Sequence, residues 1–167
     1  IRVHQPISRA DVARLSGLQR STVSLIAEQL MKESWVCEGA IGKLPRGRRP
    51  TMLVLNDDLV VMVLDIHPDQ ADIAVINLKG HFLSRASLPL PSNPEKAIAD
   101  IIACMKRMKT AHPGKSFEGI GVSLPGRVDP SSQRLIFAPN LNWLNLDIKK
   151  TIERSMRLPV ELDNAAN

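Results

Sequence analysis

The sequence has only two cysteines, few aromatic residues with no tyrosine, and no long apolar run. No apolar stretch approaches the ~20 residues that a membrane helix requires, and no segment resembles a signal peptide. Cys37 and Cys104 stand far apart, and neither has a second Cys or a His at metal-ligand spacing. We therefore expect a cytoplasmic protein with two reduced thiols and with no membrane segment or cofactor in this stretch. The chain begins with Ile1 rather than Met and stops at "ELDNAAN", so we expect it to be a piece of a longer protein.

The net positive charge lies entirely in the first third of the chain. Residues 1–56 hold nine Lys or Arg against four Asp or Glu, whereas residues 57–167 hold 13 of each and cancel. A one-sided excess of this kind is expected where a small module meets a polyanion. Nucleic acid is the leading candidate, because no basic amphipathic helix with a large aromatic face points to a membrane surface.

Residues 7–36 have the pattern of two short helices joined by a tight turn. Ser8 suits an N-cap with Asp11 as its capping-box partner, and Gly17 suits the left-handed geometry that ends the first helix. Val12 and Leu15 are spaced to share one face of that helix. In the second helix the expected apolar stripe consists of Val23, Ile26, Ala27 and Leu30.

This arrangement predicts a helix-turn-helix, whose second helix presents small polar residues and an arginine at its N-terminal end. An ordinary helical hairpin with a solvated polar face is the alternative. We predict that the DNA-reading residues of the helix are Gln19, Arg20, Ser21, Thr22 and Ser24.

The basic stretch "KLPRGRRP", residues 43–50, lies between two short predicted strands, "WVCEGAIG" and "RPTMLVLN". Flanking strands make it the tip of a β-hairpin wing, whose arginines suit the narrow and electronegative minor groove of DNA. A solvated linker is the alternative. The predicted DNA contacts of the wing are Arg46, Arg48 and Arg49.

The remaining two thirds predict a mixed α/β domain. Three β-branched runs within residues 59–90 form an expected antiparallel meander. Residues 93–112 follow as a helix with Pro94 in its first turn. Its expected inward-facing residues are Ala97, Ile98, Ile101, Ile102 and Met105. A strand at 117–126, a helix at 146–157 and a strand at 158–163 complete the pattern.

Four segments together carry a family resemblance: "ISRADVARLSGLQRSTVS", "GRRP", "GIGVSLPGRVDPSSQRLIFAPNLNW" and "LPVELDNAAN". In this order and spacing they resemble the ROK family of repressors and sugar kinases. More narrowly, they resemble its winged-helix repressor branch, which includes xylose and N-acetylglucosamine repressors. The resemblance implies a winged helix-turn-helix DNA-binding domain at 1–56 and an incomplete actin-like, ribonuclease-H-like lobe at 57–167. It also implies a second lobe beyond Asn167, with a structural zinc and most of the dimer contacts.

The role of a family residue is assigned here only where this sequence matches the family pattern. Gly126, Asn140 and Asn164 stand where the family lines its sugar cleft, so the resemblance implies that they bind the effector. The alternative is a structural role: Gly126 would make a turn and Asn140 would cap a loop. Two positions depart from the kinase pattern. "DIHPD" at 65–69 replaces a glycine-containing phosphate loop, and Ala165 replaces the catalytic aspartate.

Both departures argue against an enzyme, because proline removes a backbone donor to phosphate and alanine cannot accept a hydroxyl proton. The sequence predicts a sugar-responsive transcriptional repressor that binds a pseudo-palindromic operator as a homodimer. Two alternatives remain: a sugar kinase that gained a DNA-binding head, and a DNA-binding protein whose second domain only dimerises.

Overall fold

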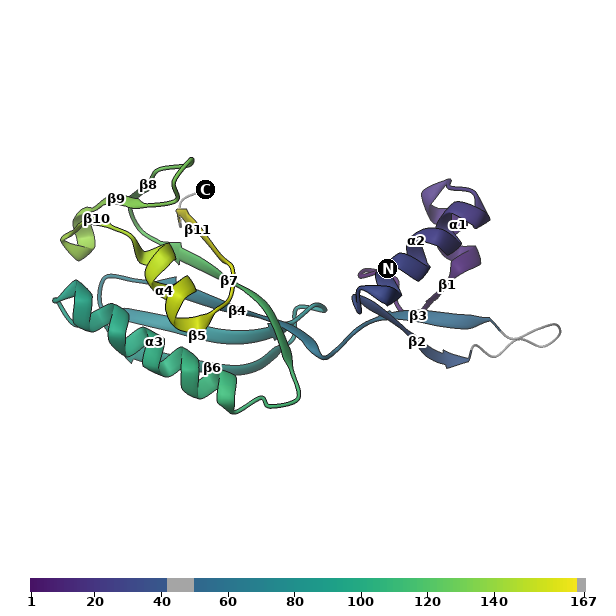
Figure 1. Cartoon of the computed structure of the whole chain (residues 1–167), viewed down its shortest axis with the longest axis horizontal. Coiled ribbons are helices and arrows are strands. Elements are labelled where there is room, and N and C mark those ends of the chain that lie inside the picture. Colours follow the sequence, from purple (N-terminus) through teal and green to yellow (C-terminus); the bar gives the residue numbers. More distant parts are fainter. Residues whose placement is uncertain (42–49, 165–167) are drawn as a thin grey trace. The chain divides into compact units, whose positions relative to one another are not determined.

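The chain forms two units, Ile1–Asp57 and Asp58–Asn167, each with its own core. The structure is a computed structural model, and it describes residues 1–41 and 50–164 (Figure 1). The predicted basic contacts Arg46, Arg48 and Arg49 lie outside the described residues, as does Ala165.

The first unit packs two helices against a small antiparallel sheet. Its elements are β1 (Ile7–Ser8), α1 (Arg9–Ser16), α2 (Arg20–Lys32), β2 (Val36–Ile41) and β3 (Thr51–Leu55). The strands pair in the order β1-β3-β2, with β3 antiparallel to both neighbours. The two strands expected on either side of the basic stretch are confirmed, whereas the two-residue strand β1 was not predicted.

The capping prediction for α1 is confirmed. The Ser8 hydroxyl accepts the Asp11 N–H at 3.1 Å and donates to the Asp11 carboxylate at 2.7 Å. That hydroxyl, followed by the Arg14 guanidinium, lowers the pKa of Asp11. Gly17 ends the helix at a φ of +72°, the left-handed conformation that favours glycine.

The apolar faces of the two helices were predicted only in part. Val23 and Ala27 are both buried, and Ala27 belongs to the core cluster with Ile7, Val36 and Leu53. Leu15 and Ile26, which the spacing places on the apolar faces of the helices, are 59% and 45% exposed, so these faces are only partly buried. The helices are short and one small sheet covers a single side of them, which leaves these positions at the margin of the core.

The second unit is built on a five-stranded mixed sheet in the order β11-β7-β4-β5-β6. Its strands are β4 (Leu59–Ile66), β5 (Gln70–Asn77), β6 (Phe82–Pro89), β7 (Ser116–Leu124) and β11 (Val160–Asn164). The meander β4-β5-β6 is antiparallel as predicted, and β4, β7 and β11 run parallel.

The two helices of this unit, α3 (Pro94–Thr110) and α4 (Ile148–Met156), pack on one face of the sheet (Figure 1). All five predicted inward residues of α3 are buried. Met62 and Leu64 of β4 join the core with them, because alternate strand residues face the helices. Asn93 caps α3 by accepting the Lys96 N–H, with Pro94 in the first turn as predicted.

A small antiparallel sheet, β10-β9-β8, was not predicted. It consists of β8 (Arg127–Val128), β9 (Leu135–Ala138) and β10 (Trp143–Leu146), with a 3-10 helix, η1 (Pro139–Leu141), between the last two. Trp143, which is 1% exposed, anchors this sheet in the main core. The sheet matters because it forms one wall of a pocket of about 1050 Å³.

Candidate nucleic-acid interface and ligand pocket

The N-terminal end of α2 is polar and exposed. Gln19, Arg20, Ser21 and Thr22 are exposed, and Ser24 is half-buried with its hydroxyl donating to the Arg20 carbonyl at 3.0 Å. The predicted reading residues therefore share the first turn and a half of one helix. The hydroxyl of Ser24 is the least available of them, since the helix backbone already binds it.

No side chain caps α2. Gln19 occupies the N-cap position without a side-chain hydrogen bond, and the first intrahelical bond runs from Val23 N–H to the Gln19 carbonyl at 3.0 Å. The N–H groups of the first turn therefore point out of the helix end, where the macrodipole is positive. This end of α2, on a helix of 13 residues, favours an anion such as a phosphate.

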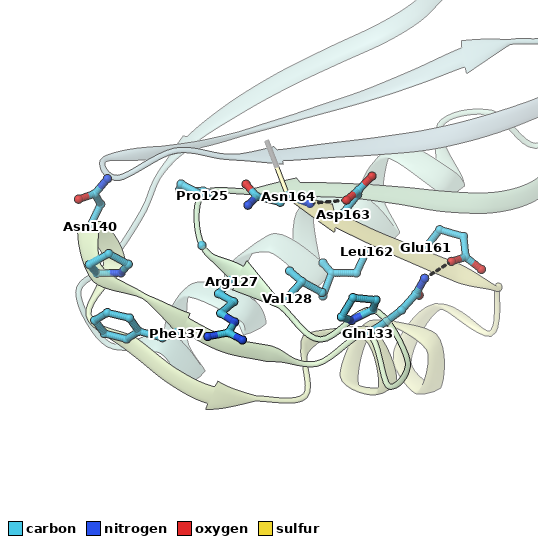
Figure 2. A pocket seen from close by; sticks show the side chains of 13 residues that line it. Pro125, Arg127, Val128, Gln133, Phe137, Asn140, Glu161, Leu162, Asp163 and Asn164 are labelled. Atoms are coloured by element: carbon cyan, nitrogen blue, oxygen red, sulfur yellow. Dashed lines mark hydrogen bonds between the residues drawn. The ribbon is translucent and has the colours of Figure 1, made fainter. Parts of the chain in front are cut away.

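The second unit contains a pocket of about 1050 Å³ between the β8–β9 hairpin and the end of β11 (Figure 2). Gly126, Asn140 and Asn164, the three predicted effector residues, all line it. They come from the turn after β7, from η1 and from the last residue of β11. The fold thus brings together positions that are up to 38 residues apart in sequence.

Gly126 holds the wall of the pocket together. Its φ is +154°, and a Cβ at this position would lie 2.7 Å from the Phe137 carbonyl oxygen and 2.9 Å from the Ala138 Cβ. No side chain fits in that space, so only glycine allows β8 to approach β9 this closely. Gly126 therefore has a steric role where the chain passes from β7 to β8.

The pocket wall on β11 is fixed by a polar network that the sequence did not reveal. Gln133 donates to Glu161 at 2.6 Å and accepts from Lys149 at 2.5 Å, and the Lys149 ammonium lies 3.8 Å from the Glu161 carboxylate. Gln133 follows a turn in which the Ser132 hydroxyl and the Ser131 N–H bind Asp129 and lower its pKa. The turn therefore keeps a charged Asp129 and its hydrogen bonds at neutral pH.

The His67 side chain in the loop after β4 contacts carboxylates of β4 and β5. The His67 Nε2 lies 3.2 Å from the Asp65 carboxylate and 3.6 Å from that of Asp72. The His67 N–H donates to the Gln70 carbonyl at 2.8 Å, and Pro68 has no N–H to offer. A phosphate therefore finds an imidazole and two carboxylates here instead of a cradle of free backbone donors.

The described residues contain neither a metal-binding cluster nor a membrane-spanning helix. No group of His, Cys, Asp and Glu side chains within 1–41 and 50–164 is arranged to hold a metal ion. None of the helices in these described ranges combines the length and hydrophobicity needed to cross a bilayer.

Three features define the class of the protein: the five-stranded mixed sheet, the pocket at its edge, and the segment at residues 119–143 that carries the family resemblance. The model of the ROK family matches residues 61–167, so the chain belongs to the ROK family. The mixed α/β fold of the second unit is that of the family's actin-like, sugar-kinase-type lobe.

Individual relatives refine this assignment. The chain is 36% identical over 168 residues to the xylose repressor of Bacillus subtilis, a match that covers 98% of this chain and 44% of that protein. A solved ROK family transcriptional regulator, a homologue of the E. coli MLC protein, has a TM-score of 0.74 at 21% identity and covers 96% of this chain and 42% of its own. The chain thus spans less than half the length of the repressor that it matches.

A kinase of the family matches a smaller share of the chain. The ROK family glucokinase from Streptomyces griseus, solved with glucose and AMPPNP, has a TM-score of 0.58 at 28% identity. That match covers 65% of this chain and 34% of the glucokinase.

Gly126→Ala should destabilise the second unit by about 1–3 kcal/mol, because the new Cβ must push β8 away from β9. Thermal or denaturant unfolding measures the change. Gly121→Ala on β7 is the matched control, since a Cβ there meets no atom within 4 Å. Equal stability of the two variants would contradict the close approach described for Gly126.

Proposed function

We propose that the protein is a DNA-binding transcriptional repressor whose DNA affinity responds to a sugar or sugar derivative. One observation carries the proposal: a single chain combines a helix with an exposed, uncapped, polar N-terminal end and a separate α/β unit with an open pocket. The match to a repressor supports it, because that similarity covers 98% of the chain, whereas the family model matches residues 61–167.

We interpret Ile1–Asp57 as a winged helix-turn-helix domain. In this interpretation α2 is the recognition helix and the β2–β3 hairpin is the wing, which agrees with the order of elements and the β1-β3-β2 ladder. Arg20 has an exposed guanidinium that suits the O6 and N7 acceptors of guanine in the major groove. The free N–H groups at the start of α2 suit a backbone phosphate and would fix the orientation of the helix.

The second unit acts as the sensor in this proposal, with Gly126, Asn140 and Asn164 as effector-binding positions. Asn140 and Asn164 offer amide donors and acceptors, which match the alternating donors and acceptors of sugar hydroxyls. We propose that the full-length protein works in the cytoplasm as a two-fold dimer, since one short reading helix gives too little contact for specific binding.

The pocket serves recognition and not phosphoryl transfer. Catalysis of that reaction rests mainly on holding the phosphates and neutralising their charge. The His67–Pro68 loop supplies neither a glycine cradle nor free donors, and two carboxylates stand beside it. Ala165, outside the described residues, offers no base to a sugar hydroxyl.

Arg20→Ala should weaken binding to the preferred duplex by about 1–3 kcal/mol and relax the preference at one base pair, since a bidentate base contact is lost. The measurement is a fluorescence titration of the full-length protein with a duplex that it selects from a random library. Arg154→Ala on the exposed face of α4 is the control for loss of charge alone. An Arg20→Ala protein with unchanged affinity and preference would remove Arg20 from the reading face.

Replacing Arg46, Arg48 and Arg49 together with alanine should flatten the salt dependence of DNA binding. Each lost phosphate contact lowers the log–log slope by about 0.9, because fewer counterions are released. The same titration, repeated over a series of salt concentrations, measures the slope. Equal slopes for the parent and the triple variant would instead mark residues 43–50 as a linker.

The full-length protein should show no ATP-dependent phosphorylation of hexoses or pentoses, and Ala165→Asp should not restore it. The added carboxylate supplies a base worth about 10²–10⁴-fold, but the phosphates remain poorly held. A coupled ADP-release assay, with an active sugar kinase as positive control, measures the turnover. Turnover by the parent protein would favour the alternative of a kinase with a DNA-binding head.

A further inference from the structure

Arg127 is the cation that lines the pocket, and the sequence did not single it out. It lies on β8 directly opposite Phe137 of β9, which in turn pairs with Leu144 of β10. Residues that pair across neighbouring strands share one face of the sheet, so Arg127, Phe137 and Leu144 form a row. Figure 2 shows the Arg127 and Phe137 side chains on the same wall, with Asp163 and Asn164 on another strand.

The position of Arg127 is fixed by its neighbour in sequence. Gly126 packs without a Cβ against the Phe137 carbonyl and Ala138, and this contact holds the start of β8 against β9. The Arg127 backbone is therefore held rigidly, although its side chain is exposed. A charged group mounted on a rigid strand loses less orientational freedom on binding than one on a mobile loop.

The charges around the pocket leave Arg127 available. Glu161 also lines the pocket, but Lys149 and Gln133 already bind its carboxylate. The Arg127 guanidinium makes no ion pair with any described residue. Asp163, the third charged residue of the lining, lies on β11 and accepts the Asn164 N–H at 2.7 Å. The described lining thus has one cation, Arg127, on the β8 side and carboxylate and amide groups on the β11 side.

Phe137 adds an apolar surface beside the guanidinium. Its ring is 47% exposed, in a chain with only three phenylalanines and no tyrosine. An exposed aromatic ring in a pocket offers a flat surface for the apolar face of a sugar ring. A guanidinium next to it offers planar, paired N–H donors that fit a phosphate or a carboxylate.

We propose that the ligand of this pocket is an anionic sugar derivative, a sugar phosphate or a sugar acid, whose charged group pairs with Arg127 and whose ring packs on Phe137. The proposal rests on the proposed function in one respect, that the pocket binds an effector. A neutral sugar would satisfy the amide groups but would make no ion pair with the exposed guanidinium. Arg127 is in this account the residue that determines specificity for charge.

Calorimetric titration of the full-length protein tests the proposal. The probes are a panel of hexoses and pentoses, each compared with its phosphate monoester and its uronic acid, and inorganic phosphate alone. At least one charged derivative should bind about tenfold or more tightly than its neutral parent, as expected for a charge-assisted hydrogen bond. Arg127→Gln should abolish that ratio, whereas Arg154→Gln, the charge-matched control on α4, should preserve it.

Several outcomes would overturn the proposal. A neutral sugar that binds as tightly as its charged derivatives, or a ratio that survives Arg127→Gln, removes the role of Arg127. If inorganic phosphate binds as tightly as any sugar phosphate, the pocket does not recognise the sugar ring. Binding of none of the probes also overturns it. Specific DNA binding by the same preparation tests the proposed function separately. Unchanged thermal unfolding of Arg127→Gln shows that the variant is folded.

Discussion

Parallel pairing of β4, β7 and β11 is the constraint on which the second unit depends. The ladder joins Val63 to Gly121 and Gly121 to Glu161, so the three strands run in register and in one direction. Their carboxyl ends therefore emerge at one edge of the sheet, where open α/β sheets bind their ligands. This arrangement places the His67 loop, Gly126 and Asn164 at the same edge of the sheet, because each lies at the end of one of these strands.

The two ends of that edge differ. The loop after β4 is occupied by an imidazole between two carboxylates, whereas the turn after β7 and the end of β11 still enclose a pocket. A site that binds a sugar without transferring a phosphate can use its binding energy to shift a conformational equilibrium. Such a shift is what a repressor needs, provided that the ligand has different affinities for the two states.

Regular elements of the fold were predictable from the sequence because each has a strong local signal. The capped start of α1, the apolar stripe of α3 and the β-branched runs of β4 and β5 are recognisable by periodicity and capping chemistry alone. The exposure of Leu15 and Ile26 was not predictable in this way, since periodicity indicates which residues share a face but not what covers that face.

Recognition of the pocket from the sequence was also partial. Gly126, Asn140 and Asn164 were identified through family motifs. Arg127 and Phe137 were missed because their pairing depends on β8, a strand of two residues. The Asp129–Pro130 turn between apolar residues was the available signal for this hairpin. The Gln133–Lys149–Glu161 network joins three separate elements, so no local pattern could have indicated it.

We propose that this chain belongs to a repressor that reads DNA and responds to a ligand in the pocket of its second unit. Selection of duplexes from a random library by the full-length protein, followed by footprinting with and without an effector found by calorimetry, tests it most directly. The account predicts a pseudo-palindromic site with half-sites about one or more whole helical turns apart, and occupancy that changes with the effector. Two results would contradict it. One is that no sequence is enriched, and the other is a single asymmetric half-site whose occupancy does not change with any ligand that binds the pocket.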